Sequence, residues 1–233
     1  MVDLDKLKRD GYIVIKKAIK NPEIKHQYLK KDTRVHSVSM WNIRLSLKKY
    51  FKQIFNTSNL AASFDGNLIG NCQAIDWHVD QNLSRDTNIQ YVQGVLALKP
   101  SHSTHLLVGS HRYFNSLAIR NCDKLNPTWE SYNIPLSDPI WRRGLNIETP
   151  RLDAGDLLIF DSRLVHSVSK NKYRSVVYVS MMPRNHILNQ VERLRIKGFL
   201  EGWHTTHWCD RFIKRCVSGP IRKSVPKKFK DLI

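Results

Sequence analysis

The sequence predicts a mainly β fold with flanking helices, a double-stranded β-helix of the jelly-roll, cupin-like type. Over residues 60–182, short apolar stretches alternate with turn-rich links, which is typical of an all-β sandwich or barrel. On both sides of this region, apolar residues recur at helical spacing. The strands are expected at residues 60–65, 70–77, 90–98, 105–108, 147–151, 157–161, 164–168 and 174–182.

The flanking segments are predicted to be mostly helical. The longest pattern, residues 41–55, alternates apolar and basic side chains at helical spacing and predicts a helix packed on the outside of a sheet. Gly11 ends a short amphipathic helix and precedes a strand at residues 12–19. The other helices are expected at residues 3–9, 187–200 and 205–216.

A chain of 233 residues is long enough for one domain with additions. We expect N-terminal helices and a strand at residues 1–59, the β core at 60–185, and a basic helical extension and tail at 186–233. The core carries a long insertion, residues 113–143, which is expected to form a lid over a substrate pocket, since loops of this length are usually functional.

Composition indicates an ordinary globular protein with 41% hydrophobic and 25% charged residues. No stretch resembles a signal peptide or a membrane span, so an intracellular, soluble protein is expected. The four cysteines form no CxxC pair, which fits reduced thiols. Nothing in the sequence assigns an oligomeric state.

The net charge of +18 is concentrated on the flanks of the chain. Lys and Arg exceed Asp and Glu by nine in residues 1–52 and by seven in residues 186–233, but only by two in residues 53–185. Basic flanks favour binding to nucleic acid or another polyanion. The alternative is a solvated surface that promotes solubility.

The stretch Ile75–Asn82 contains a His-x-Asp pair, His78 and Asp80. In a strand, residues two apart point to the same face, so an imidazole and a carboxylate project together from a strand end. They are two of the three ligands of the facial triad that holds non-heme Fe(II) and leaves coordination positions open. The alternative is a hydrogen-bonded His-Asp pair without a metal.

A second segment supplies a third ligand and an anion-binding residue. Residues 153–161 predict a turn that leads into a buried strand, and His166 follows closely. Arg174 then opens another strand, and its fork-shaped guanidinium suits the bidentate capture of a carboxylate. The alternative for Arg174 is a surface side chain on an edge strand. Together these residues indicate an iron-dependent oxygenase with a small dicarboxylic co-substrate.

The order of these motifs resembles the Fe(II)/2-oxoglutarate dioxygenases, specifically the phytanoyl-CoA dioxygenase-like branch. The resemblance covers roughly residues 5 to 185. Further segments that agree with this branch are Asp10–Ile15, Ser63–Gly66, Val92–Leu98 and Val108–His111.

The resemblance implies a complete catalytic site. His78, Asp80 and His166 would bind Fe(II), and O2 would enter an open coordination position. Oxidative decarboxylation of 2-oxoglutarate to succinate and CO2 would be coupled to hydroxylation of an unactivated C–H bond.

The resemblance also implies contacts to 2-oxoglutarate from Arg174, Ser167 and Gln93. The interval between His166 and Arg174 is shorter than is usual in the family, and the family's hydroxyl position is occupied by Val168, with Ser167 displaced by one. Gln93 has an alternative role as a polar residue that pairs within the barrel.

Two further groups of polar residues have candidate roles. Asp76 would orient a metal ligand through a hydrogen bond, as residues around metal ligands commonly do. A zinc site is a minor alternative for a C-terminal cluster whose spacing matches none of the usual structural zinc patterns. The cluster comprises His204, His207, Cys209 and Cys216.

Three functional hypotheses follow. The first is hydroxylation of a small metabolite or acyl-type substrate. The second is the same chemistry on a nucleic acid or on a protein bound to one, motivated by the basic flanks. The third is a non-enzymatic basic jelly-roll protein that acts in binding or assembly, which the intact triad argues against.

Overall fold

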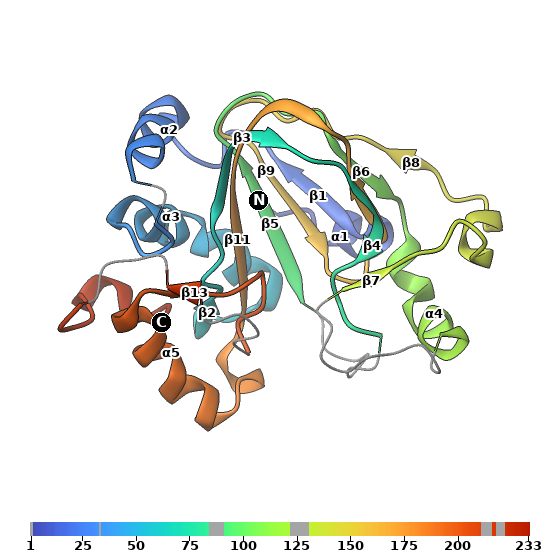
Figure 1. Cartoon of the computed structure of the whole chain (residues 1–233). Coiled ribbons are helices and arrows are strands. Elements are labelled where there is room, and N and C mark those ends of the chain that lie inside the picture. The colour runs from blue at the N-terminus through green and yellow to red at the C-terminus, as the bar shows by residue number, and fades with distance from the viewer. Residues whose placement is uncertain (1, 33, 84–90, 122–130, 211–215, 218–221) are drawn as a thin grey trace.

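The computed structural model describes residues 2–32, 34–83, 91–121, 131–210, 216–217 and 222–233. Two antiparallel sheets face each other, and helices cover the outer face of the larger one (Figure 1). This arrangement is the double-stranded β-helix that the sequence predicts.

The larger sheet has six strands in the order β1-β9-β5-β11-β2, with β3 also paired to β11. The central strand β5 is buried along its whole length because both faces of the sheet are covered. The strands are β1 (Tyr12–Ile15), β2 (Leu60–Ala62), β3 (Asn67–Cys72), β5 (Val92–Ala97), β9 (Leu157–Asp161) and β11 (Asn171–Pro183).

The smaller sheet has five strands in the order β7-β4-β10-β6-β8. These strands are β4 (Ile75–Val79), β6 (Thr104–Leu107), β7 (Tyr132–Asn133), β8 (Ile147–Glu148) and β10 (His166–Val168). A separate pair, β12 (Trp203–His204) with β13 (Cys216–Val217), lies in the C-terminal region.

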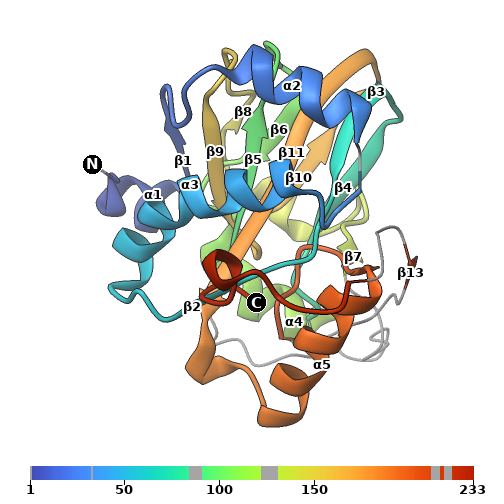
Figure 2. The ribbon, with the colours of Figure 1, turned by 90° about the vertical axis from the view of Figure 1, so that its left-hand side faces the viewer.

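The helices α2 and α3 cross the outer face of the six-stranded sheet (Figure 2). The helix α3 begins where the Ser37 side chain accepts a hydrogen bond from the Met40 amide, and ends at Asn56, which adopts the left-handed conformation. The helices are α1 (Leu4–Asp10), α2 (Pro22–Lys31), α3 (Val38–Phe55), α4 (Phe114–Arg120) and α5 (Asn189–Glu201). Short 3-10 turns lie at Ser110–Tyr113, Pro139–Arg142, Arg184–His186 and Lys227–Phe229.

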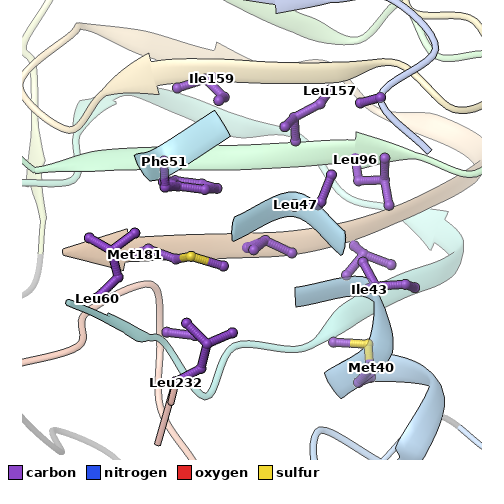
Figure 3. Close-up of a cluster of buried hydrophobic side chains, with 14 of the residues drawn as sticks. Met40, Ile43, Leu47, Phe51, Leu60, Leu96, Leu157, Ile159, Met181 and Leu232 are labelled. Carbon is purple, nitrogen blue, oxygen red and sulfur yellow. The ribbon is translucent and has the colours of Figure 1, made fainter. Parts of the chain in front are cut away.

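The main core lies between α3 and the six-stranded sheet (Figure 3). Apolar side chains on one face of α3 pack against β5, β9 and β11, as the spacing within residues 41–55 predicts. Burial of each large side chain contributes about 1.5–3 kcal/mol. The fully buried members of this contact include Met40, Ile43, Leu47, Phe51, Leu96, Leu157, Ile159 and Met181.

A second core fills the space between the two sheets. Val95 on β5, Phe160 on β9 and Leu106 on β6 are all buried in it. Strand alternation explains the two cores, because Val92 and Leu96 on β5 face α3 whereas Val95 faces the other sheet.

The C-terminal residues fold back into the main core. Leu232 and Ile233 are buried there, and Arg195 of α5 is only 1% exposed. The Arg195 guanidinium donates hydrogen bonds to four backbone carbonyls, so it joins α5 to β2 and to the chain end. These are the carbonyls of Ala62 at 2.6 Å, Cys209 at 2.8 Å, Leu232 at 3.0 Å and Ile233.

Three sequence-based predictions of elements are wrong. The single strand expected at residues 70–77 is two strands, β3 and β4, because the chain passes from one sheet to the other between Cys72 and Ile75. The strand expected at 12–19 ends at Ile15. The helix expected at 205–216 is absent from its described residues 205–210, while residues 211–215 lie outside the described part.

None of the described helices is both long enough and apolar enough to cross a lipid bilayer.

Candidate active site

The pairing of β4 with β10 brings the predicted triad together. His78 on β4 lies directly opposite His166 on β10 in the antiparallel register, and their ring centroids are 4.2 Å apart. The Asp80 carboxylate follows β4 and lies 3.4 Å from Nε2 of His78 and 3.2 Å from Nε2 of His166. The three candidate ligand atoms all lie within 4.8 Å of one another, so they can contact one ion.

Both imidazoles are held in the same tautomer by backbone carbonyls. Nδ1 of His78 lies 2.7 Å from the Asp76 carbonyl, and Nδ1 of His166 lies 2.9 Å from the Leu164 carbonyl. A carbonyl can only accept, so each Nδ1 carries a proton. When the imidazole is neutral, its Nε2 has a lone pair that can bind a metal ion, and when it is protonated, Nε2 donates to Asp80 instead. This is the usual arrangement around metal-binding histidines.

The third candidate ligand is oriented by an amide. Gln93 on β5 donates a hydrogen bond of 2.7 Å from its Nε2 to Oδ2 of Asp80. Gln93 therefore positions the carboxylate from the neighbouring sheet. Asp76 also acts on the site, but through its backbone carbonyl, since its side chain is exposed.

The three side chains of the triad shift one another's pKa values. Burial alone would raise the pKa of Asp80, but His207, His166 and the hydrogen bonds from both triad histidines hold it well below its usual value. Burial opposes a charge on His78, yet Asp80 raises its pKa overall. Burial, together with the neighbouring His78, lowers the pKa of His166. The carboxylate is thus ionised, as a metal ligand must be.

Arg174 lines the same cavity as the triad and is 3% exposed. Its guanidinium donates a hydrogen bond of 3.0 Å to Oγ1 of Thr104 and has a weak contact of 3.9 Å with Sγ of Cys72. Its Nε atom has no partner, and no described carboxylate forms an ion pair with it. Buried charges are normally paired, so this guanidinium is poised for an anionic ligand.

Ser167 does not line the cavity, so its predicted contact to 2-oxoglutarate is wrong. Side chains alternate along β10, and the cavity is lined by His166 and Val168 on one face, whereas Ser167 lies on the other. The hydroxyl next to Arg174 belongs to Thr104 on β6. No local sequence pattern links Thr104 to Arg174, which lies 70 positions away, so Thr104 could not be predicted as its partner.

The cavity has a volume of about 520 Å³. Its walls come from both sheets, from Val35 and from the segment 204–207. None of the described residues of 113–143 lines it. Instead Phe114, Leu117 and Ile140 from that insertion pack into a separate apolar cluster, so the predicted lid is wrong for its described part. Residues 122–130 of the predicted lid lie outside the described part.

The residues proposed as a zinc cluster contact other groups. Cys209 is buried, and its Sγ lies 3.2 Å from the Tyr91 hydroxyl. Nε2 of His207 lies 3.3 Å from the Asp80 carbonyl oxygen. Among the described side chains, only the triad brings three or more candidate metal ligands together. The side chain of Cys216 lies outside the described part.

The chain matches no protein-family model, and no curated protein sequence matches it. Solved structures do share its fold. One is the epimerase SnoN in complex with Fe3+, alpha-ketoglutarate and nogalamycin RO, at 16% identity over 77% of this chain and 81% of that one, with a TM-score of 0.58.

Two further structures are similar over comparable lengths. HygX from Streptomyces hygroscopicus with nickel, 2-oxoglutarate and hygromycin B bound is 13% identical over 78% of this chain and 88% of that one, with a TM-score of 0.57. EctD from S. alaskensis with 2-oxoglutarate and 5-hydroxyectoine is 14% identical over 80% of this chain and 77% of that one, with a TM-score of 0.56. At these identities the likeness establishes the fold, a double-stranded β-helix, and confirms the predicted fold class.

Proposed function

We propose that this protein is a non-heme Fe(II)/2-oxoglutarate-dependent oxygenase that acts on a small molecule. One observation carries the proposal. Three converging ligand atoms, from His78, Asp80 and His166, share a cavity with the buried guanidinium of Arg174, and no described carboxylate neutralises that guanidinium.

The triad fits a metal that binds by one face. Two imidazole Nε2 atoms with fixed lone pairs and one ionised carboxylate form the ligand set used by non-heme Fe(II) oxygenases. Bound there, Fe(II) would supply the activation of O2, which amino-acid side chains cannot perform. The chain's own contribution is to orient the ligands through Gln93 and the carbonyls of Asp76 and Leu164.

Arg174 and Thr104 fit the distal carboxylate of 2-oxoglutarate. The guanidinium offers charged donors, and the Thr104 hydroxyl adjoins it at 3.0 Å. In the proposed reaction, 2-oxoglutarate loses CO2 and becomes succinate, which gains one atom of O2. The other oxygen atom enters a C–H bond of the substrate, which becomes an alcohol.

The size of the cavity favours a small-molecule substrate. A volume of about 520 Å³ lies within the range of small-molecule sites, and side chains of both sheets enclose it. Two of the similar structures hold 2-oxoglutarate together with hygromycin B or 5-hydroxyectoine, according to their descriptions. Membership of the phytanoyl-CoA dioxygenase-like branch rests on the sequence motifs and stays a prediction.

Anaerobic titration of the metal-free protein with Fe(II) and 2-oxoglutarate tests this proposal. The wild type should develop the visible charge-transfer band of the iron chelate, and His166→Ala should abolish it. Arg174→Leu should raise the dissociation constant for 2-oxoglutarate at least about a hundredfold, since it removes two charge-assisted hydrogen bonds.

Exposed residues of the same types provide the controls. His186→Ala and Arg151→Leu alter exposed side chains and should leave the band and its titration unchanged. A wild-type protein that shows no band at any concentration of Fe(II) and 2-oxoglutarate would overturn the proposal.

A further inference from the structure

The cavity has a polar wall that the proposed co-substrate does not use. We define this polar wall as Asp65, Asn67, Thr206 and His207, all of which line the cavity together with the triad. Asp65 lies in the link between β2 and β3 and Asn67 begins β3, whereas Thr206 and His207 follow β12. Two segments far apart in the sequence therefore bring polar groups to the same space.

Asp65 is a half-buried carboxylate with little compensation. Its Oδ1 accepts one hydrogen bond, of 2.7 Å, from the amide of Gly66, and it forms no ion pair with any described residue. Burial raises the pKa of Asp65 to about 6, although His207, the Gly66 amide and Arg44 oppose the shift. At neutral pH the group is still mostly ionised.

Arg44 is close to this loop, but its donors are directed to the backbone. It is fully buried on α3 and donates hydrogen bonds to the carbonyl of Val35 at 2.8 Å and to that of Asp65 at 2.6 Å. Arg44 therefore fixes the backbone that carries Asp65 and leaves the carboxylate free to bind another group.

Thr206 adds an unused hydroxyl to the polar wall. Its Oγ1 is buried and has no hydrogen-bond partner among the described residues. Buried hydroxyls are normally bonded, and Thr206 lines the cavity, so rotation of its side chain would give the hydroxyl a partner in a cavity ligand. The carboxylate and the hydroxyl together require a ligand with hydrogen-bond donors.

The charge of the loaded site points to a cation. This step rests on the proposed function. With Fe(II) and doubly charged 2-oxoglutarate in place, the charges of the ion, the co-substrate, Asp80 and Arg174 cancel. Asp65 is then left as an uncompensated carboxylate beside a neutral centre, and the most favourable partner for it is a positive charge.

We propose that the substrate is a small amine whose ammonium group binds Asp65, with the Thr206 hydroxyl accepting a hydrogen bond from the same end of the molecule. The remaining carbon chain extends from the polar wall toward the triad. Asp65 thus selects cationic substrates over neutral or anionic ones of the same size.

Three matched probes test the proposal: butylammonium, butan-1-ol and butyrate. Their binding to protein loaded with Zn(II) and 2-oxoglutarate is measured by saturation-transfer NMR on wild type, Asp65→Asn and Asp5→Asn. Asparagine can still accept from the Gly66 amide, so Asp65→Asn should fold. Asp5 lies exposed on α1 and controls for the change in net charge.

Wild type should bind butylammonium at least about tenfold more tightly than the other two probes, because a charge-assisted hydrogen bond is worth more than a neutral one. Asp65→Asn should abolish that preference, whereas Asp5→Asn should keep it. Equal binding of the probes, a preference for butyrate, no detectable binding of butylammonium, or a preference that survives Asp65→Asn would each overturn the proposal.

The signals of 2-oxoglutarate in the same samples report on the proposed function separately. Saturation transfer to 2-oxoglutarate without selection of butylammonium would overturn only the amine proposal. Selection of butylammonium through Asp65 without binding of 2-oxoglutarate would support the cation site and contradict the oxygenase proposal.

Discussion

Two of the buried arginines, Arg174 and Arg195, should respond to the same substitution in opposite directions. Arg174 and Arg195 are 3% and 1% exposed. Arg195 donates to four backbone carbonyls, whereas Arg174 donates to one hydroxyl, that of Thr104, and to a distant thiol, and its Nε has no partner among the described residues. Arg174→Leu removes a poorly satisfied charge, while Arg195→Leu leaves carbonyls unpaired.

The magnitudes follow from these contacts. An unsatisfied buried polar group costs about 1–3 kcal/mol, so Arg174→Leu should stabilise the metal-free protein by about that amount. Arg195→Leu should destabilise it by about 3–5 kcal/mol, the usual effect of breaking a buried polar network. For a chain of this length, the melting temperature shifts by about 2–4 °C for each kcal/mol.

Thermal unfolding of the metal-free protein, followed by circular dichroism without 2-oxoglutarate, measures both effects. Arg174→Leu should melt above wild type and Arg195→Leu well below it. Adding Zn(II) and 2-oxoglutarate should raise the melting temperature of both proteins. The rise should be larger for wild type than for Arg174→Leu, because only wild type binds the co-substrate tightly. If Arg174→Leu melts as low as Arg195→Leu, Arg174 stabilises the fold and the reasoning about an anion site is refuted.

Three other substitutions test further parts of the structure. Gln93→Leu removes the amide that donates to Asp80 and should weaken Fe(II) binding about 10–100-fold in a metal titration, whereas unchanged affinity would deny Gln93 its positioning role. The folded pKa of Asp65, about 6, exceeds its ordinary value of 3.8, so the native state retains a proton that the unfolded state releases, and stability falls as pH rises through this window. In urea unfolding, Asp65→Asn should therefore have a free energy of unfolding that exceeds that of wild type by at most about 3 kcal/mol at pH 7 and equals it near pH 4. A lower free energy of unfolding than wild type at pH 7 would contradict this. Gly94→Ala would place a Cβ 2.6 Å from the Val179 carbonyl and should lower the free energy of unfolding by about 1–3 kcal/mol or more, and a neutral effect would mean that β5 and β11 can separate at this point.

The triad could be predicted because its chemistry follows strand periodicity. Residues two apart share a face, so His78 and Asp80 are recognisable as a pair from the sequence. The same rule, applied from His166, selects Val168 and excludes Ser167, as the structure shows. The error at Ser167 came from following the nearest hydroxyl in the sequence instead of the alternation of the strand.

The polar wall could not be predicted from local patterns. The helix predicted at residues 205–216 does not form over residues 205–210, where the amide of Thr205 donates to the Phe64 carbonyl and the Tyr91 hydroxyl donates to the His207 carbonyl. These long-range bonds override local helix propensity and hold the segment against the cavity. Thr104 beside Arg174 is likewise placed by strand pairing between distant parts of the chain.

Turnover in isotopically labelled O2 tests the central claim most directly. Protein loaded with Fe(II) and 2-oxoglutarate should form succinate slowly even without a substrate, and mass spectrometry should find one labelled oxygen atom in it. His166→Ala should form none, and His186→Ala should behave as wild type. Unlabelled succinate, or equal amounts from wild type and His166→Ala, would contradict the assignment of the triad and Arg174 to an oxygenase site.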